Sequence, residues 1–476
     1  MTLNSEGIKL TVHRYIAILA ILIVLAMTVL DGTVVNVALP VLATKFNVSD
    51  SHAVWIVTIY QLVITMLLLP LSSLGDIYSY KRNFLIGVSV FTIGSIFCAS
   101  SQSFFLLIGA RAIQGIGAAF IMGVNVALIR LIYPAKILGR GLAINAMVIA
   151  ISSAAGPTIA GAVLSVASWQ WLFLINVPFG ILAFLIGYKY LPKNPPRDHR
   201  TRFDFISGIA NVVVFGLIFY SLGSFALKGE LILNIGLLVL GLIIGYFYIH
   251  HLHNREQPMF PVDLLHIKLY ALSILTSNCS FIAQNVALIS LPFLFLNGYG
   301  FSEISTGLLM TPWPLATMIV SPFAARWVER HNPGLTASLG MMIYAFGVIM
   351  LMTAPMGAGL SEWNIAWRMA ICGIGFGMFQ TPNNIIMIQA TPMERSGAAG
   401  GMQSTARLVG QTLGATIVTV VFAFATTPSG SGAPDDGAMA VHYCLIVAIC
   451  FAVIAGVFSI SRFRFTSKNQ KLPEKS

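Results

Sequence analysis

The chain carries fourteen apolar stretches of roughly membrane length, with little polar sequence between them. A bilayer core takes about 20 apolar residues per helix. Backbone in lipid must satisfy its own hydrogen bonds, so each stretch is predicted to be a helix. The predicted spans are Tyr15–Leu39, Ala53–Ser72, Phe84–Ala99, Phe104–Leu131, Gly141–Val166, Trp171–Tyr190, Asp204–Phe225, Leu231–Ile249, Leu269–Leu296, Ile304–Trp327, Leu335–Thr353, Trp363–Ile388, Gly397–Ala425 and Ala438–Ser461. Only 9% of residues are charged, against about 25% in soluble domains. The sequence therefore predicts an all-α integral membrane protein with fourteen transmembrane helices.

Lysine and arginine collect on one side of these predicted spans. The amino terminus, the tail and the loops after even-numbered spans hold 22 of the 27 residues. The opposite side holds Lys45 and Lys228, while Arg111, Arg368 and Arg407 lie inside spans. The positive-inside rule then places both termini in the cytoplasm. Because membrane topology explains the net charge of +11, we expect no nucleic-acid-binding face.

Parts of the first half of the chain recur in the second half. The residues Gly115, Gly117, Asn125 and Pro134 recur 258 positions later as Gly373, Gly375, Asn383 and Pro392. We predict an N-terminal six-helix bundle (1–195), a linker with two extra helices (196–256) and a C-terminal six-helix bundle with a cytoplasmic tail (257–476). Paired repeats with a site between them are typical of secondary transporters. Chance similarity among glycine-rich helices is the alternative.

One acidic residue, Asp31, lies well inside a predicted span. By helix rise it is about 13 Å from the outer end of the first span, and Arg111 is about 10 Å into the fourth span from the same side. An ionisable group in a membrane helix is costly unless it is paired or faces water. We predict that Asp31 takes up and releases protons, and that Arg111 biases its pKa. A static ion pair that joins two helices is the alternative.

Polar residues at helical spacing mark further spans, and residues three or four apart share a face of a helix. Such faces either line a water-filled cavity or form hydrogen bonds between helices. Aromatic rings attract organic cations, although ordinary packing is the alternative for each ring. We predict a substrate cavity lined by Tyr60, Gln114, Asn125, Asn278, Phe281, Gln284, Asn285, Trp313, Gln380, Asn383 and Arg407.

Several longer motifs are specific. Residues 30–40 read LDGTVVNVALP, residues 107–119 contain Arg111, Gln114, Gly115 and Gly117, and residues 156–161 read GPTIAG. Residues 169–178 (WQWLFLINVP) and Phe203-Asp204 add to the pattern. With these motifs the whole chain resembles the major facilitator superfamily, and within it the fourteen-helix drug:proton antiporter family. The resemblance implies the major facilitator fold, with two six-helix bundles plus two extra linker helices, and a part for Arg111 in proton transfer.

Two segments are predicted to gate the transporter. The loop after the second span keeps Asp76, Lys81 and Arg82, but Ile77 stands where the family usually has arginine. In the fifth span, Gly156 and Gly161 allow close approach of another helix. Pro157 removes one backbone hydrogen bond and bends that span. We expect these six residues to lie where the two halves move against each other.

These observations predict a proton-coupled multidrug exporter of the bacterial cytoplasmic (inner) membrane that works by alternating access. The expected substrates are amphipathic or cationic compounds, and the alternative is export of an endogenous lipid or metabolite. An integral membrane enzyme fits worse, because the sequence offers no nucleophile–base arrangement and no His/Glu metal cluster. The motifs for proton coupling argue against a passive channel or receptor. We expect a monomer in the lipid bilayer whose partners are protons and a small molecule, with no cofactor and no metal.

Overall fold

The structure is a computed structural model that describes residues 12–134, 137–192, 203–224, 231–253, 260–354, 361–391, 396–425 and 434–462. Within this part of the chain nearly every residue is helical, which confirms the all-α prediction. The predicted domain boundaries near 195 and 256, the cytoplasmic tail, Lys228 and Pro392 lie outside the described residues. Those boundaries therefore stay predictions.

The helices follow one another with short connections. The first group is α1 (Val12–Phe46), α2 (Asp50–Ile77), α3 (Tyr80–Ala99), α4 (Phe104–Ile132), α5 (Leu138–Val166), α6 (Trp171–Leu174) and α7 (Asn176–Tyr190). Next come α8 (Phe205–Ser224), α9 (Leu231–His253) and the short α10 (Val262–Leu265). The last group is α11 (Lys268–Phe293), the π-helical turn η3 (Leu294–Gly298), α12 (Glu303–Met310), α13 (Pro312–Val328), α14 (Pro333–Met352), α15 (Glu362–Gln389), α16 (Ser396–Ala425) and α17 (Pro434–Ser461).

Local sequence fixes where several of these helices begin. Ser49, Ser79, Ser103 and Ser302 precede α2, α3, α4 and α12, and each side chain accepts a hydrogen bond from a backbone N–H of the first turn. Asn332 does the same for α14, with its Oδ1 2.9 Å from the nitrogen of Gly334. Such caps satisfy backbone donors that have no partner within the helix. Short polar connections therefore separate spans that hydrophobicity alone would leave hard to delimit.

Thirteen helical segments of the described chain are long and apolar enough to cross a membrane. They match thirteen of the predicted spans. The remaining predicted span corresponds to α15, which is 28 residues long but carries Glu362, Arg368, Asn383 and several other polar residues. This helix packs along α13 and α14, so the protein itself, rather than lipid, surrounds much of its polar surface.

Two predicted spans are not continuous helices. The span Trp171–Tyr190 divides into α6 and α7 at Ile175, and the span Ile304–Trp327 divides into α12 and α13 at Thr311. In the second case Pro312 has no N–H to donate, and its ring is disfavoured inside a helix. The break leaves Thr311 between two helical segments, at a position that contacts another helix.

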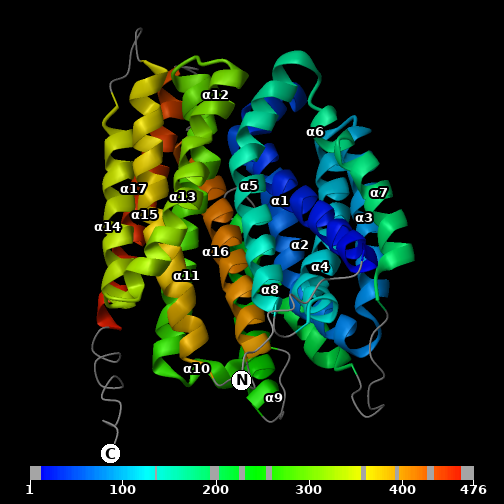
Figure 1. Ribbon diagram of the computed structural model, residues 1–476. Helices are drawn as coiled ribbons and strands as arrows, with labels where there is room; N and C mark the ends of the chain where they lie inside the picture. The colour runs from blue at the N-terminus through cyan, green and yellow to red at the C-terminus, as the bar shows by residue number, and fades with distance from the viewer. Residues whose placement is uncertain are drawn as a thin grey trace, which may run out of the picture.

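The helices form two groups that stand side by side (Figure 1). We call α1–α7 the N-terminal half and α11–α17 the C-terminal half. Between them in sequence, α8 and α9 pack on each other, and α8 also contacts α2 and α16. The Asn211 side chain of α8 donates to the carbonyl of Met66 in α2 at 2.7 Å. The extra pair is therefore attached to helices of both halves.

The internal repeat has a structural counterpart in close helix contacts. A side chain at Gly117 would collide with the backbone of Phe91 and Gly87, and one at Gly375 would collide with Tyr344 and Gly340. Both pairs of partners are 253 residues apart in the sequence. Likewise Gly115 lies against the carbonyl of Tyr60, and Gly373 against that of Trp313. The same glycine frame thus joins equivalent helices in both halves, which argues against chance similarity.

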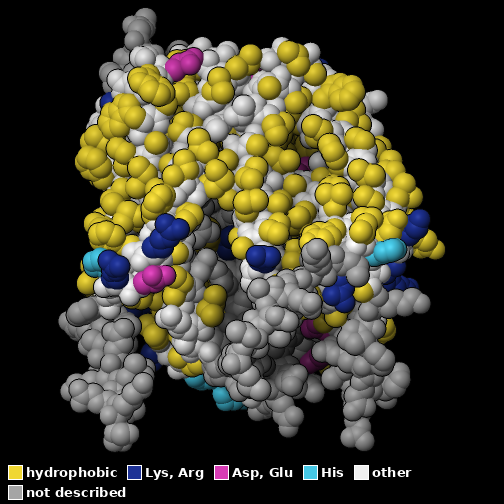
Figure 2. Space-filling model, viewed as in Figure 1, with side chains coloured by type: hydrophobic (Ala, Val, Ile, Leu, Met, Phe, Trp, Pro, Cys, Tyr) yellow, Lys and Arg dark blue, Asp and Glu magenta, His cyan; other side chains and the backbone are white. Residues whose placement is uncertain are grey.

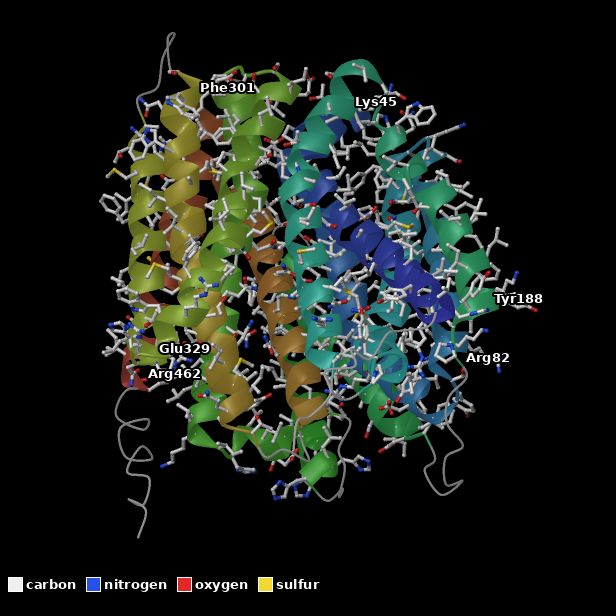
Figure 3. The ribbon with its side chains drawn as sticks, viewed as in Figure 1. Lys45, Arg82, Tyr188, Phe301, Glu329 and Arg462 are labelled. Carbon is white, nitrogen blue, oxygen red and sulfur yellow. The ribbon has the colours of Figure 1, made fainter. Side chains whose placement is uncertain are left out.

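Charged side chains separate the two ends of the molecule. Figure 3 labels Lys45 and Phe301 near one end, and Arg82, Glu329 and Arg462 toward the other. In the space-filling view most of the visible Lys and Arg side chains lie in the lower half, the end that carries Arg82 (Figure 2). We call this the basic end and the other the outer end.

Candidate functional site

A buried ion pair lies inside the N-terminal half. The Nη1 atom of Arg111 in α4 is 2.5 Å from Oδ2 of Asp31 in α1, and neither side chain is exposed to solvent. The sequence predicted that these residues reach similar depth, and the structure brings them together. Whether the pair moves protons is not decided by its geometry, so that role stays a prediction.

Two amide side chains complete the surroundings of the Asp31 carboxylate. The Nε2 atom of Gln114 donates to Oδ1 at 2.8 Å and also lies 2.9 Å from Oγ of Ser95. The Nδ2 atom of Asn176, at the start of α7, donates to the same Oδ1 at 3.2 Å. We call Asp31, Ser95, Arg111, Gln114 and Asn176 the carboxylate cluster. Three donors directed at one carboxyl group suit its ionised form.

Arg111 is held by several groups besides Asp31. Its Nε donates to the carbonyl of Ile56 at 3.2 Å and its Nη1 to Oε1 of Gln114 at 2.6 Å. Its guanidinium carbon lies 4.1 Å from the centroid of the Tyr60 ring and 5.7 Å from that of Phe173. Cation–π contact of this kind is favourable where water is excluded. Tyr60 is therefore buried against the carboxylate cluster in this conformation, and its place in a substrate cavity stays a prediction.

A second set of polar contacts joins the two halves near the middle of the helices. Oγ1 of Thr65 in α2 lies 3.1 Å from Oγ1 of Thr412 in α16. Nδ2 of Asn285 in α11 donates to the carbonyl of Gln411 at 2.6 Å and lies 3.4 Å from Oε1 of Gln61. We call these five residues the polar layer. Of these five residues, the sequence predicted only Asn285 as a site residue. Nothing in the sequence of α2 or α16 indicates that their threonine and glutamine side chains face the other half.

Closer to the outer end, α5 of the N-terminal half touches α12 of the C-terminal half. A side chain at Gly161 would come within 2.6 Å of the carbonyl of Glu303, and one at Gly307 would strike the carbonyl of Pro157. Between them, the hydroxyls of Thr158 and Thr311 are 2.5 Å apart. The predicted gating residues Pro157 and Gly161 thus lie at a contact between the halves. Their function in gating stays a prediction.

The carboxylate cluster is directly connected to this contact. Two residues after Asp31, the side chain of Thr33 lies against Gly156 of α5, where an added side chain would collide with it. Gly156 is followed at once by the segment 157–161 that touches α12. Thr33 and Gly156 therefore place the carboxylate cluster next to the segment of α5 that touches α12.

The described residues of the two halves share hydrogen bonds in the middle of the helices and toward the outer end. Figure 2 shows the surface hollowed between the halves toward the basic end. In this conformation the halves are in contact on the outer side, and the visible face is hollowed toward the basic end (Figure 2).

The structure sorts the predicted cavity residues into two sets. Seven of them are buried in this conformation, namely Tyr60, Gln114, Asn125, Phe281, Asn285, Trp313 and Asn383, and their place in a substrate cavity stays a prediction. Gln114 belongs to the carboxylate cluster. Asn125 donates to Oδ1 of Asn145 at 2.8 Å, and Trp313 packs against Tyr344. The side chains that keep partial exposure are Asn278, Gln284, Gln380 and Arg407.

Arg462 was expected in the basic tail, and the structure shows otherwise. It is fully buried, with Nη1 2.9 Å from Oγ of Ser273 and 2.6 Å from Oδ1 of Asn383, and Nη2 2.6 Å from Oγ of Ser459. The side chain follows directly on α17 and enters the C-terminal half. Its position explains why Asn383 is buried rather than open to a cavity.

The other predicted gating residues lie at the basic end of the N-terminal half. Oδ1 of Asp76 accepts a hydrogen bond from the hydroxyl of Tyr80 at 2.6 Å. Nζ of Lys81 donates to the carbonyl of Tyr188 at 2.6 Å, and Arg82 is exposed. Lys81 therefore ties α3 to α7 within one half, and its expected part in a gate stays a prediction.

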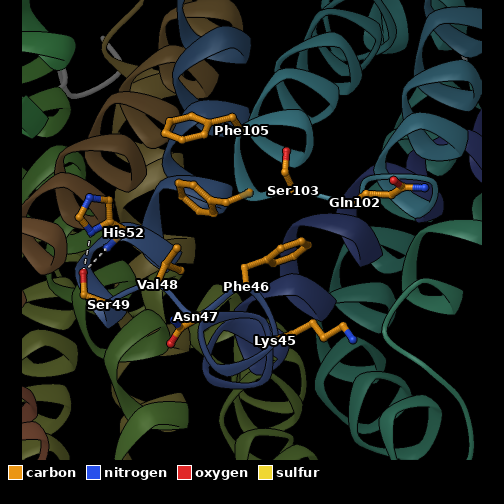
Figure 4. A pocket seen from close by; sticks show the side chains of 10 residues that line it. Lys45, Phe46, Asn47, Val48, Ser49, His52, Gln102, Ser103 and Phe105 are labelled. Atoms are coloured by element: carbon orange, nitrogen blue, oxygen red, sulfur yellow. Dashed lines mark hydrogen bonds between the residues drawn. The ribbon is translucent and has the colours of Figure 1, made fainter.

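At the outer end the structure has a cavity of about 620 Å³ between the ends of α1, α2 and α4. Its lining includes Lys45, Phe46, His52 and Gln102, and Nδ1 of His52 is 2.6 Å from Oγ of Ser49 (Figure 4). The cavity belongs to the N-terminal half and lies beyond the contact of α5 with α12. It is separate from the hollow on the basic side.

Comparison with known proteins finds one matching family model and several relatives that are similar along most of the chain. The family model described as Major Facilitator Superfamily matches residues 21–415. The chain is 46% identical to the uncharacterized transporter YebQ of Escherichia coli K12, with 96% of this chain and 97% of the relative covered. It is 27% identical to the riboflavin transporter RibZ of Clostridioides difficile, covering 96% and 99%. It is 29% identical to the multidrug resistance protein Stp of Mycobacterium tuberculosis, covering 84% and 74%.

Among solved structures, a bacterial homologue of the human lysosomal transporter Spinster superposes with a TM-score of 0.71 at 15% identity. The match covers 99% of this chain and 100% of that chain. At this identity the likeness concerns the fold alone.

Proposed function

Because this chain belongs to the Major Facilitator Superfamily, whose members are transporters and not enzymes, we propose that it is a proton-coupled exporter of amphipathic small organic molecules. The two halves alternate between exposing a central site to the cytoplasm and to the outside. In this proposal the basic end is cytoplasmic, both termini lie there, and the protein works as a monomer in the bacterial inner membrane. It needs no cofactor.

One observation carries the proposal: the Asp31 carboxylate is buried with Arg111, and Thr33, two residues further on, lies against Gly156, next to the residues of α5 that touch α12. In the conformation described, the three donors around the Asp31 carboxylate hold α1 against α4 and α7. Protonation removes the charge that Arg111 and the amides stabilise, so the cluster loosens. Thr33 then shifts against Gly156, and the contact of α5 with α12 changes with it.

The direction of transport follows from this coupling. When the outer side opens, the Asp31 carboxylate gains access to a proton from the more acidic exterior. Protonation there releases α1 from the cluster, so the contact of α5 with α12 can form again as the halves return to the conformation described here. The proton then leaves toward the cytoplasm, and Asp31 pairs again with Arg111. Cargo that enters from the hollow at the basic end is carried outward in the same cycle.

Reconstitution in liposomes tests this proposal. A proton gradient is imposed, and the movement of a fluorescent amphipathic dye is followed for the wild type, Asp31→Asn and Glu329→Gln, the last an exposed acidic residue at the basic end. We expect gradient-driven transport in the wild type and in Glu329→Gln, and none in Asp31→Asn. Dye movement that needs no gradient would indicate a channel. Normal pumping by Asp31→Asn would refute the role of the carboxylate.

Export of an endogenous metabolite is the second candidate. It is favoured by the similarity to a protein named as a riboflavin transporter along almost the whole chain. Failure to move any dye, together with gradient-driven transport of riboflavin that Asp31→Asn abolishes, would support this alternative.

A further inference from the structure

Arg407 is a positive charge near the middle of a membrane-spanning helix. It lies eleven residues after the start of the 30-residue α16, about 16 Å along the helix axis. Its side chain is partly exposed. An arginine at this depth is costly unless it has a partner or serves a pathway for substrate.

Three other arginines inside the helix bundle have acceptors. Arg111 has Asp31, Arg462 has Asn383, and Arg368 donates to the carbonyl of Met350. Arg407 has neither an ion pair nor a hydrogen bond with any described residue. In the described part of the chain the acidic side chains other than Asp31 belong to the ends of helices or the connections between them, namely Asp50, Asp76, Asp204, Asp263, Glu303, Glu329 and Glu362. Asp31 itself forms an ion pair with Arg111.

The neighbours of Arg407 place it at the boundary between the halves. Gln403 and Gln411 are four residues away on the same face of α16 and are also partly exposed. The adjacent Leu408 belongs to a buried apolar cluster whose other buried members, Tyr60 and Ile64 among them, come from the N-terminal half. One turn toward the outer end, Gln411 and Thr412 belong to the polar layer. Arg407 is therefore on the basic side of the layer that closes the space between the halves.

On these observations we propose that Arg407 binds an anionic group of the transported molecule, and that the cargo carries a carboxylate. The guanidinium presents a planar fork of donors that matches a carboxylate with two hydrogen bonds. The amides of Gln403 and Gln411 add donors and acceptors on either side. The ligand supplies the counter-charge that the described residues do not provide, and a positively charged group of a ligand would be repelled there. This inference rests on the proposed function, narrows its substrate class, and replaces the cationic preference expected from the sequence.

A matched pair of dyes tests the proposal. A rhodamine with a free carboxylate and its methyl ester differ in that group alone, so they report on recognition of the charge. Equilibrium binding to the purified protein is measured by fluorescence polarisation without any proton gradient, and gradient-driven transport is measured in liposomes. We expect the wild type to prefer the carboxylate form. Arg407→Gln is expected to weaken binding of that form about tenfold to a hundredfold and not to weaken binding of the ester.

Two further variants separate recognition from structural damage. Arg407→Lys keeps the charge without the fork and is expected to restore part of the preference for the carboxylate. Arg326→Gln removes an exposed arginine of α13 and is expected to leave the binding of both dyes unchanged. The proposal would be overturned if Arg407→Gln weakened the binding of both dyes equally, or if the wild type bound the ester more tightly than the carboxylate form. The binding assay needs no proton coupling, so its result stands even if Asp31→Asn pumps normally.

Discussion

The two halves share a helix frame but differ in what they bury at equivalent positions. Gly117 and Gly375 make the same close contact with their neighbouring helices. Arg111 and Gln114 of the N-terminal half correspond, 258 residues on, to Met369 and Cys372, which are fully buried. Asp31 corresponds to Ala283 at an offset of 252, and the carbonyl of Ala283 accepts a hydrogen bond from the Tyr344 hydroxyl at 2.9 Å. One half thus buries an ion pair where the other buries apolar side chains.

This difference shows that the frame does not need the ion pair. The C-terminal half packs α11, α14 and α15 tightly with Met369, Cys372 and a group of aromatic rings. Burying two charges removes them from water, and an apolar replacement of similar volume is often as stable or more so. The carboxylate cluster is therefore better explained by function than by folding. The predictions that follow test this comparison.

The largest effect on transport is expected when the ion pair of the N-terminal half is replaced by apolar residues, as at the equivalent positions of the C-terminal half. The double variant Asp31→Ala with Arg111→Met should lose gradient-driven transport completely, because no titratable group remains in the cluster. Its stability in mixed micelles, measured by SDS-induced unfolding, should stay near that of the wild type. A double variant that fails to fold would show that the ion pair is structural, against our interpretation.

Removing only the cation should be far more damaging to stability. Arg111→Met leaves the Asp31 carboxylate buried without its charged partner, which we expect to lower the free energy of unfolding by about 3–5 kcal/mol. The same unfolding assay measures this loss. Restoration of stability by adding Asp31→Ala to Arg111→Met is the expected control, and an additive loss would contradict the coupling of the two residues.

A smaller effect, equal in both halves, is expected at the shared glycines. Gly117→Ala and Gly375→Ala each place a methyl group against backbone of the neighbouring helix, which should lower stability by about 1–3 kcal/mol. Gly109→Ala, where the space is open, serves as the control. If only one of the two glycines proved sensitive, the halves would not share the frame.

The smallest effect is expected at Asn125. Its hydrogen bond to Asn145 joins α4 to α5, and such bonds between membrane helices contribute about 0.6 kcal/mol on average. Asn125→Ala should therefore change stability slightly and leave transport intact. A large loss of transport with unchanged stability would instead support the predicted place of Asn125 in the substrate cavity.

Much of the fold could be predicted from the sequence because the membrane restricts the choice. Span length, the distribution of lysine and arginine, and the depths of Asp31 and Arg111 follow from bilayer thickness and helix rise. The breaks at Ile175 and Thr311 were not predicted, since both spans remain apolar across them. The burial of Arg462 was missed for a related reason: a basic residue after the last span looks like part of an exposed tail.

The sequence by itself determined the number of spans, the family and the pair of charges at one depth, because each depends on local composition or on short motifs. Only the tertiary structure decided that Gln114, Asn176 and Ser95 complete the carboxylate cluster, and that Thr33 links it to α5. It also decided that Arg407 has no acceptor among the residues that the structure describes. These facts depend on which faces of distant helices meet, and in a chain whose helices are apolar on most sides the sequence pattern does not specify those faces.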